Sequence, residues 1–157
     1  MSVSKIVAAA ASGVGGAGLD VDEVFSTFLY DGTSSAQTIT NGIDLAGEGG
    51  LVWGKARSTG EGHFLADSER GKGSNNNFVY LRSGETTGNI DEANRSLSSF
   101  NSNGFTIQDG SDSQVNNSSH TYVSWTFRKQ PKFFDVVTWT GNATAGRTVS
   151  HNLGTVP

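Results

Sequence analysis

The sequence predicts an all-β fold, an antiparallel β-sandwich or jelly roll with an extended N-terminal arm. Three observations predict it. About eight short segments read as strands, Gly- and Asn-rich turns separate them, and no segment has the 3.6-residue period of an amphipathic helix. Many short strands joined by such turns are typical of sandwiches and jelly rolls. A chain of 157 residues is long enough for one such domain with its own core.

The clearest strand covers residues 121–128. Large apolar side chains alternate along it with hydroxyl-bearing ones: Val123, Trp125 and Phe127 with Tyr122, Ser124 and Thr126. This two-residue period predicts a half-buried strand with the apolar groups packed in the core. Pro131 lacks an amide hydrogen, so an extended connector is expected after the strand.

The remaining strands are predicted between turns along the rest of the chain. They cover residues 24–30, 37–40, 51–56, 62–67, 78–82, 97–100 and 105–108. We expect 51–56 to be a buried central strand, because its apolar run lies between glycines. Gly54 within it is interpreted as a bulge or a close approach by another backbone. Long polar loops are predicted at 83–95 and 109–119.

Composition limits the classes of partner. Net charge is −4, and acidic and basic residues are interspersed, so neither nucleic acid nor an anionic membrane is an expected partner. No span approaches the roughly 20 apolar residues of a membrane helix, so no membrane insertion is expected. Hydrophobic residues make up 34% and there is no cysteine, so stability must come from packing or assembly rather than disulfides.

An internal similarity relates residues 28–41 to residues 137–152. Tyr30 aligns with Trp139 and Gly32 with Gly141, as in two copies of one β-hairpin. Chance similarity between threonine-rich hairpins is the alternative. The repeat predicts a sandwich unit at 20–128, followed at 129–157 by a connector and the start of a second repeat. We therefore expect a longer protein that continues beyond Pro157.

The N-terminal arm, residues 1–19, consists mostly of small residues. Its glycines at 13–18 match the dinucleotide pattern G-x-G-x-x-G, but no helix is predicted after them, so no cofactor is expected. Its apolar run is also shorter than that of a signal peptide. An extended arm that threads between subunits fits better, because small residues allow close backbone approach. The predicted docking residues are Ile6, Val7, Val14, Gly15, Gly16 and Gly18.

The most enzyme-like cluster is His63, Asp67, Glu69 and Arg70. It suggests a base oriented by a carboxylate, but the sequence indicates neither a nucleophile nor a second carboxylate. We therefore expect these residues to solvate the outer face of a strand, with no catalytic residue and no enzyme activity. The loop at 109–113 offers oxygen ligands for calcium but lacks the spacing of an EF-hand, so no metal is predicted.

The three tryptophans, Trp53, Trp125 and Trp139, each lie in an apolar strand pattern. Packing in the sandwich core is the favoured interpretation, because aromatic side chains dominate buried sandwich faces. A stacking platform for a sugar ring is the alternative.

Six stretches of the chain resemble repeats in structural proteins of tailed bacteriophages from marine hosts. The similarity covers nearly all of the chain from Asp20. The stretches are 30–33 (YDGT), 37–53 (QTITNGIDLAGEGGLVW), 99–106 (SFNSNGFT), 122–129 (YVSWTFRK), 133–142 (FFDVVTWTGN) and 147–154 (RTVSHNLG).

The resemblance implies a lectin-like jelly roll in a tail fibre or another appendage of the virion, with no catalytic motif to transfer. It predicts a homotrimer whose arm docks on tail, neck or adaptor proteins. The alternative is a carbohydrate-binding lectin-like module or a glycosidase-related receptor-binding protein, whose polar loops contact a host surface glycan through Asn75, Asn76 and Asn77. A glycosidase would need two carboxylates at one cleft, and the sequence indicates no such pair.

Overall fold

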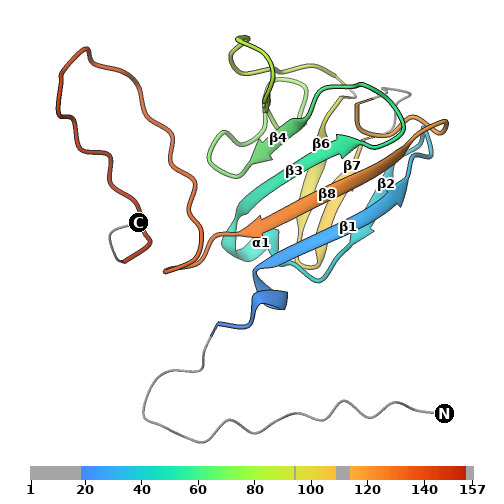
Figure 1. Cartoon of the computed structure of the whole chain (residues 1–157), viewed down its shortest axis with the longest axis horizontal. Helices are drawn as coiled ribbons and strands as arrows, with labels where there is room; N and C mark the ends of the chain where they lie inside the picture. The colour runs from blue at the N-terminus through green and yellow to red at the C-terminus, as the bar shows by residue number, and fades with distance from the viewer. Residues whose placement is uncertain (1–18, 94, 109–113, 155–157) are drawn as a thin grey trace, which may run out of the picture.

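The computed structural model describes residues 19–93, 95–108 and 114–154, which form a sandwich of two antiparallel sheets (Figure 1). The larger sheet has the strand order β1-β8-β3-β4-β5 and the smaller has the order β2-β7-β6. The all-β sandwich prediction is confirmed. The strands are β1 (Phe25–Asp31), β2 (Gln37–Thr40), β3 (Gly50–Ala56), β4 (Phe64–Asp67), β5 (Tyr80–Arg82), β6 (Leu97–Asn101), β7 (Gly104–Ile107) and β8 (Thr121–Arg128).

Helical structure in the described residues is limited to two short turns. The 3-10 helix η1 (Val21–Glu23) precedes β1, and α1 (Leu45–Glu48) lies between β2 and β3. The Asp44 carboxylate caps α1 by accepting from the amide of Gly47. In the described part of the chain, no helix is long and apolar enough to cross a membrane.

The predicted hairpin at 28–41 is wrong, because β1 and β2 belong to different sheets. The connection between them crosses the sandwich and is held by the buried side chain of Asn116. Its Oδ1 accepts from the amide of Thr33, and its Nδ2 donates to the carbonyl of Ser35. A side chain distant in sequence therefore redirects the turn. In the proposed second copy, the described residues 137–152 contain no strand.

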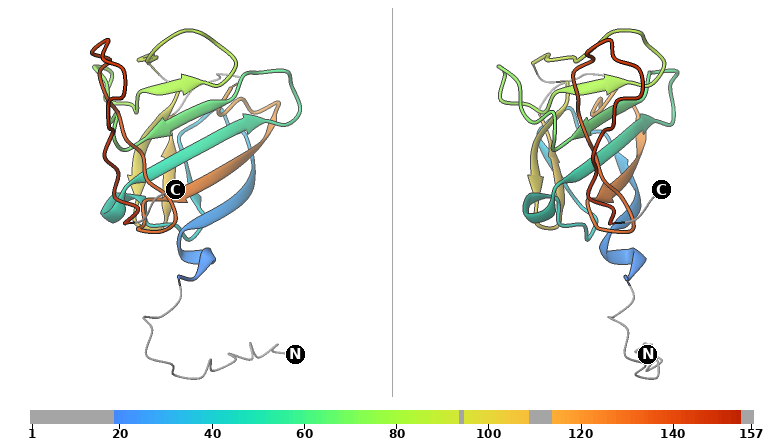
Figure 2. Two further views of the ribbon diagram at one scale, coloured as in Figure 1. Left: turned by 60° about the vertical axis from the view of Figure 1, so that its left-hand side comes forward. Right: turned by 90° about the vertical axis from the view of Figure 1, so that its left-hand side faces the viewer.

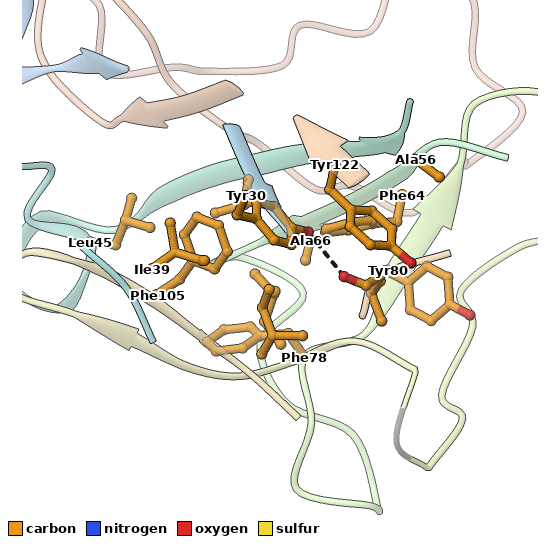
Figure 3. Close-up of a cluster of buried hydrophobic side chains, with 14 of the residues drawn as sticks. Tyr30, Ile39, Leu45, Ala56, Phe64, Ala66, Phe78, Tyr80, Phe105 and Tyr122 are labelled. Carbon is orange, nitrogen blue, oxygen red and sulfur yellow. Dashed lines mark hydrogen bonds between the residues drawn. The ribbon is translucent and has the colours of Figure 1, made fainter. Parts of the chain in front are cut away.

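The core lies between the sheets and is rich in aromatic rings (Figure 3). Tyr30 and Tyr122 stack with ring centroids 5.1 Å apart, and the Tyr30 hydroxyl donates to the carbonyl of Val115. Burial, and secondarily Tyr122, raises the pKa of Tyr30 far above its usual range. Phe64 and Phe105 are fully buried beside them.

The inward face of β8 is the hydroxyl face, opposite to the prediction. Tyr122, Ser124 and Thr126 are fully buried, whereas Trp125 and Phe127 lie on the outer side and are partly exposed. The space available in the core explains why this face of β8 is the buried one. Gly54 of β3 pairs with Ser124, and a Cβ atom at Gly54 would lie 2.2 Å from the Phe64 ring. The close approach predicted at Gly54 is thus found, but a ring rather than a backbone makes it.

The C-terminal segment, residues 129–154, leaves β8 and runs along the side of the sandwich (Figure 2). Its two ends are joined near Asp135. The amide of Lys132 donates to the carbonyl of Leu153, and the amide of Asn152 donates to the Asp135 carboxylate at 2.7 Å. This carboxylate also lies 3.5 Å from the ammonium group of Lys129. The segment is therefore closed at its base as one long loop.

Candidate functional site

The outward face of the five-stranded sheet carries apolar side chains from every strand. One row follows from the strand register: Thr27 pairs with Trp125, Trp125 with Trp53, Trp53 with Leu65, and Leu65 with Leu81. We call this surface the aromatic face. It consists of Phe25, Leu29, Leu51, Trp53, Leu65, Leu81, Val123, Trp125 and Phe127.

The rings of the aromatic face contact one another across the strands. The centroids of Trp53 and Trp125 are 5.4 Å apart with the rings tilted by 58°, and those of Phe25 and Phe127 are 5.0 Å apart. Phe134 of the C-terminal segment packs on Phe127 at 5.2 Å and extends the surface at one end. The rings therefore form two groups on the face, one of the two tryptophans and one of the three phenylalanines.

No described segment crosses the outward side of β1, β8 and β3 (Figure 1). Leu29 is accordingly 58% exposed, and Trp53, Trp125 and Phe127 remain partly exposed despite covering one another. The prediction that Trp53 and Trp125 pack in the core is therefore wrong. An uncovered apolar surface of this kind marks a contact with another molecule more often than it serves stability.

The outer face of the smaller sheet is polar by contrast. The hydroxyls of Thr38 and Thr106 lie 3.0 Å apart, and the Asn101 amide donates to Thr106 at 2.9 Å. A polar outer face is the usual arrangement in an antiparallel sandwich. The two outer faces of this molecule thus differ in chemistry, which selects the aromatic face as the candidate interaction site.

His63 forms a polar rim beside the aromatic face. The indole Nε1–H of Trp53 donates to Nδ1 of His63 at 2.8 Å, so the imidazole is neutral and carries its proton on Nε2. Burial, and secondarily the charge of Lys55, lowers the pKa of His63. His63 therefore holds the Trp53 ring in position through a hydrogen bond that requires the neutral imidazole.

The structure divides the cluster predicted at 63–70: Asp67 and Arg70 pair with each other, whereas the side chains of His63 and Glu69 have other partners. Asp67 is fully buried, pairs with Arg70 and accepts from the amides of Glu69 and Arg70, whereas Glu69 pairs with Lys129 at 2.6 Å. The expectation of solvated side chains is therefore wrong for Asp67. Within the described ranges, no three His, Cys, Asp or Glu side chains gather as a metal site would require.

The asparagines predicted to contact a glycan lie in the 72–77 loop. Asn75 and Asn76 are exposed, whereas Asn77 is 3% exposed. The Asn75 amide donates to Asp91, whose carboxylate also accepts from Ser74. The hydrogen bond from the Ser74 side chain is the main cause of the lowered pKa of Asp91. Asp91 thus ties this loop to the 83–91 loop.

The other predicted site residues lie outside the described residues. They are the six docking positions of the arm, Ile6, Val7, Val14, Gly15, Gly16 and Gly18, and the calcium candidates at 109–113. The glycan contact and the arm contact stay predictions.

Sequence reasoning missed the aromatic face because alternation separates two faces of a strand without saying which one is buried. A signal was nevertheless present. Trp53 and Trp125 alternate with Gly54 and Ser124, and these two small residues pair with each other on neighbouring strands, which leaves room for a ring on their own side. That pattern indicates that the small residues face the core, where a ring from another strand fills the space, and that the large side chains face outward.

A family model described as a domain of unknown function (DUF7483) matches residues 20–157. No curated protein and no solved structure matches the chain.

Proposed function

We propose that this chain, which belongs to the DUF7483 family, is a structural protein of a bacteriophage virion, at the root of a tail fibre or of a neck or tail appendage. The observation that carries this proposal is the aromatic face, an apolar surface across all five strands of the larger sheet. A protein that works alone in water gains nothing from such a surface, whereas a subunit of an assembly covers it. The resemblance to phage appendage repeats supports the same role.

The partner proposed for the aromatic face is further copies of this chain in a closed symmetric assembly, a homotrimer. The centre of the face holds aromatic and aliphatic groups, and charged residues lie towards its ends: Lys55 and Asp31 at one end, and Asp67, which pairs with Leu51, at the other. Depletion of charge at the core with enrichment of Trp and Phe is the composition of a protein interface. Symmetric homo-oligomers are the usual outcome when one chain supplies both sides.

The proposed arm, residues 1–19, docks on tail, neck or adaptor proteins, while the sandwich projects towards the host surface. The experiment is a pull-down of purified virion proteins with three baits: the intact chain, a chain lacking residues 1–18, and the Leu29→Lys variant. We expect the intact chain to capture tail or neck proteins and the truncated chain to lose them. The Leu29→Lys variant keeps the arm and should still capture them, with weaker self-association. Equal capture by the intact and truncated chains, or no capture by either, would refute the anchoring role.

A further inference from the structure

We propose a second site, a pocket for a neutral pyranose sugar between the C-terminal segment and the edge of the sandwich. The pocket has a volume of about 290 Å³ and is lined by Arg70, Asn89, Val137, Thr138 and Trp139. Its volume is at the lower end of small-molecule sites, which suits one or two sugar rings. Aromatic, cationic, amide and hydroxyl groups therefore face a single space.

Trp139 supplies the aromatic platform. It is 63% exposed, the most exposed of the large apolar side chains described. The face of an indole ring carries partial negative charge, so it attracts the partially positive C–H groups on the flat side of a pyranose. An exposed tryptophan on a long loop contributes little to folding. Its position over a polar pocket is better explained by a ligand.

Arg70 and Asn89 supply fixed hydrogen-bond donors. Arg70 Nε–H donates to Asn89 Oδ1 at 3.2 Å, and Arg70 also pairs with the buried carboxylate of Asp67. The guanidinium is thus held from two sides, while the Arg70 side chain remains 22% exposed. With Asn89 Oδ1 accepting from Arg70, the Nδ2–H groups of Asn89 supply donors to sugar hydroxyls. Such prior ordering lowers the entropic cost of binding.

Local charge selects an uncharged ligand. The positive charge of Arg70 is balanced by the carboxylate of Asp67, which is fully buried and pairs with the guanidinium. A sugar carboxylate or sulfate would have to compete with Asp67 for the guanidinium. Hydroxyl groups need only the remaining donors and the Thr138 hydroxyl, which both donates and accepts. The matching class is therefore a neutral sugar.

The pocket is independent of the aromatic face and extends the proposed function. Asn89 lies on the 83–91 loop, which Asp91 ties to Ser74 and Asn75. The polar loops predicted to contact a glycan therefore belong to the same end of the molecule as the pocket. Sugar binding and self-association can each fail without the other, because they use different residues.

The test is saturation-transfer NMR on the full chain with defined oligosaccharides. The neutral probes are maltohexaose, cellohexaose and mannohexaose, and the charged probe is trigalacturonate. We expect saturation transfer to at least one neutral probe and a weaker signal or none with trigalacturonate. Trp139→Ala should weaken that binding at least about tenfold, whereas Trp139→Tyr, which keeps an aromatic face, should retain most of it.

Two controls keep the result interpretable. Trp53→Phe alters a tryptophan on the aromatic face and should leave sugar binding unchanged. Arg70→Lys keeps a cation for Asp67 but loses the planar fork, so it should weaken binding while the chain stays folded. No binding to any neutral probe, preferential binding of trigalacturonate, or native affinity in Trp139→Ala would each overturn the proposal.

Discussion

Two buried hydroxyls in β8 differ in what surrounds them. Thr126 Oγ1 accepts from the Asn41 amide at 2.8 Å, whereas Ser124 Oγ has no hydrogen-bond partner among the described residues. Both side chains are fully buried. Burial of an unpaired hydroxyl lowers the free energy of unfolding, whereas a hydrogen bond to a buried hydroxyl offsets the cost of its burial. The same chemical group therefore has opposite effects on stability two residues apart.

Substitution of each hydroxyl tests this difference. We expect Ser124→Ala to leave the free energy of unfolding unchanged or to raise it by about 1 kcal/mol, because no hydrogen bond is lost. Thr126→Val should lower it by about 1 kcal/mol, because the Asn41 amide loses its acceptor. Urea unfolding followed by tryptophan fluorescence measures both. Equal destabilisation by the two changes would contradict the hydrogen-bond assignment.

The His63–Trp53 bond makes stability depend on pH. The pKa of His63 is lower in the folded chain than in the unfolded chain, where it is about 6.5. The folded state then binds fewer protons, so the contribution of His63 is fully present above pH 6.5. It is lost as the pH falls through the lowered pKa of the folded state.

We accordingly expect the free energy of unfolding to be lower at pH 5 than at pH 7.5. His63→Gln keeps an acceptor for the Trp53 indole but does not titrate, so this variant should show a smaller difference between the two pH values. Urea titrations at both pH values measure it. If native chain and variant lose the same free energy on acidification, His63 is not the titrating group.

Among the loops, the C-terminal segment is closed partly by contacts of a single side chain, Asp135. Its side chain is 5% exposed, accepts from the amides of Val136 and Asn152, and lies near Lys129. Lys129 also binds Glu69 in the turn after β4, and this hydrogen bond is the main cause of its raised pKa. Lys129 therefore links the carboxylate of Asp135 within the segment to that of Glu69 on the sandwich.

Removal of this fastening should free the segment without unfolding the sandwich. In Asp135→Ala we expect faster trypsin cleavage at Arg147, because the loop opens more often, while the main urea transition changes little. Asp31→Ala, at the exposed end of β1, is the matched control and should be cleaved at the native rate. Unchanged cleavage in Asp135→Ala would show that other contacts hold the segment.

The positions of the strands were predictable, because alternation and turn residues are local properties. The predicted strands at 51–56 and 121–128 match β3 and β8 closely. The partners of the strands were not predictable in the same way. The residues after Asp31 predict a hairpin, but hydrogen bonds to Asn116 hold this connection in a path that leads to the other sheet. A contact between residues 83 positions apart leaves no local pattern.

For the whole molecule, composition predicts a sandwich whose stability depends on packing or assembly, but it does not indicate which surface takes part in the assembly. The alternation in β8 predicts an inward apolar face, since burial of apolar groups is the usual outcome. The structure has the opposite face inward, because Gly54, which pairs with Ser124, leaves room for the Phe64 ring in the core. The candidate site thus depends on packing between strands, which one strand cannot reveal.

For the whole molecule, we expect assembly through the aromatic face. Leu29 and Val21 provide a matched pair, because they are 58% and 57% exposed and only Leu29 belongs to the face. A lysine at Leu29 would place a charge in the proposed interface, where desolvation without a partner opposes association. A lysine at Val21 would remain in water.

The most direct measurement is sedimentation equilibrium of the intact chain and of the Leu29→Lys and Val21→Lys variants. We expect the mass of a trimer for the intact chain and for Val21→Lys, and a shift towards monomer for Leu29→Lys. A monomeric mass for the intact chain, or a trimer that Leu29→Lys leaves undisturbed, would contradict assembly through the aromatic face.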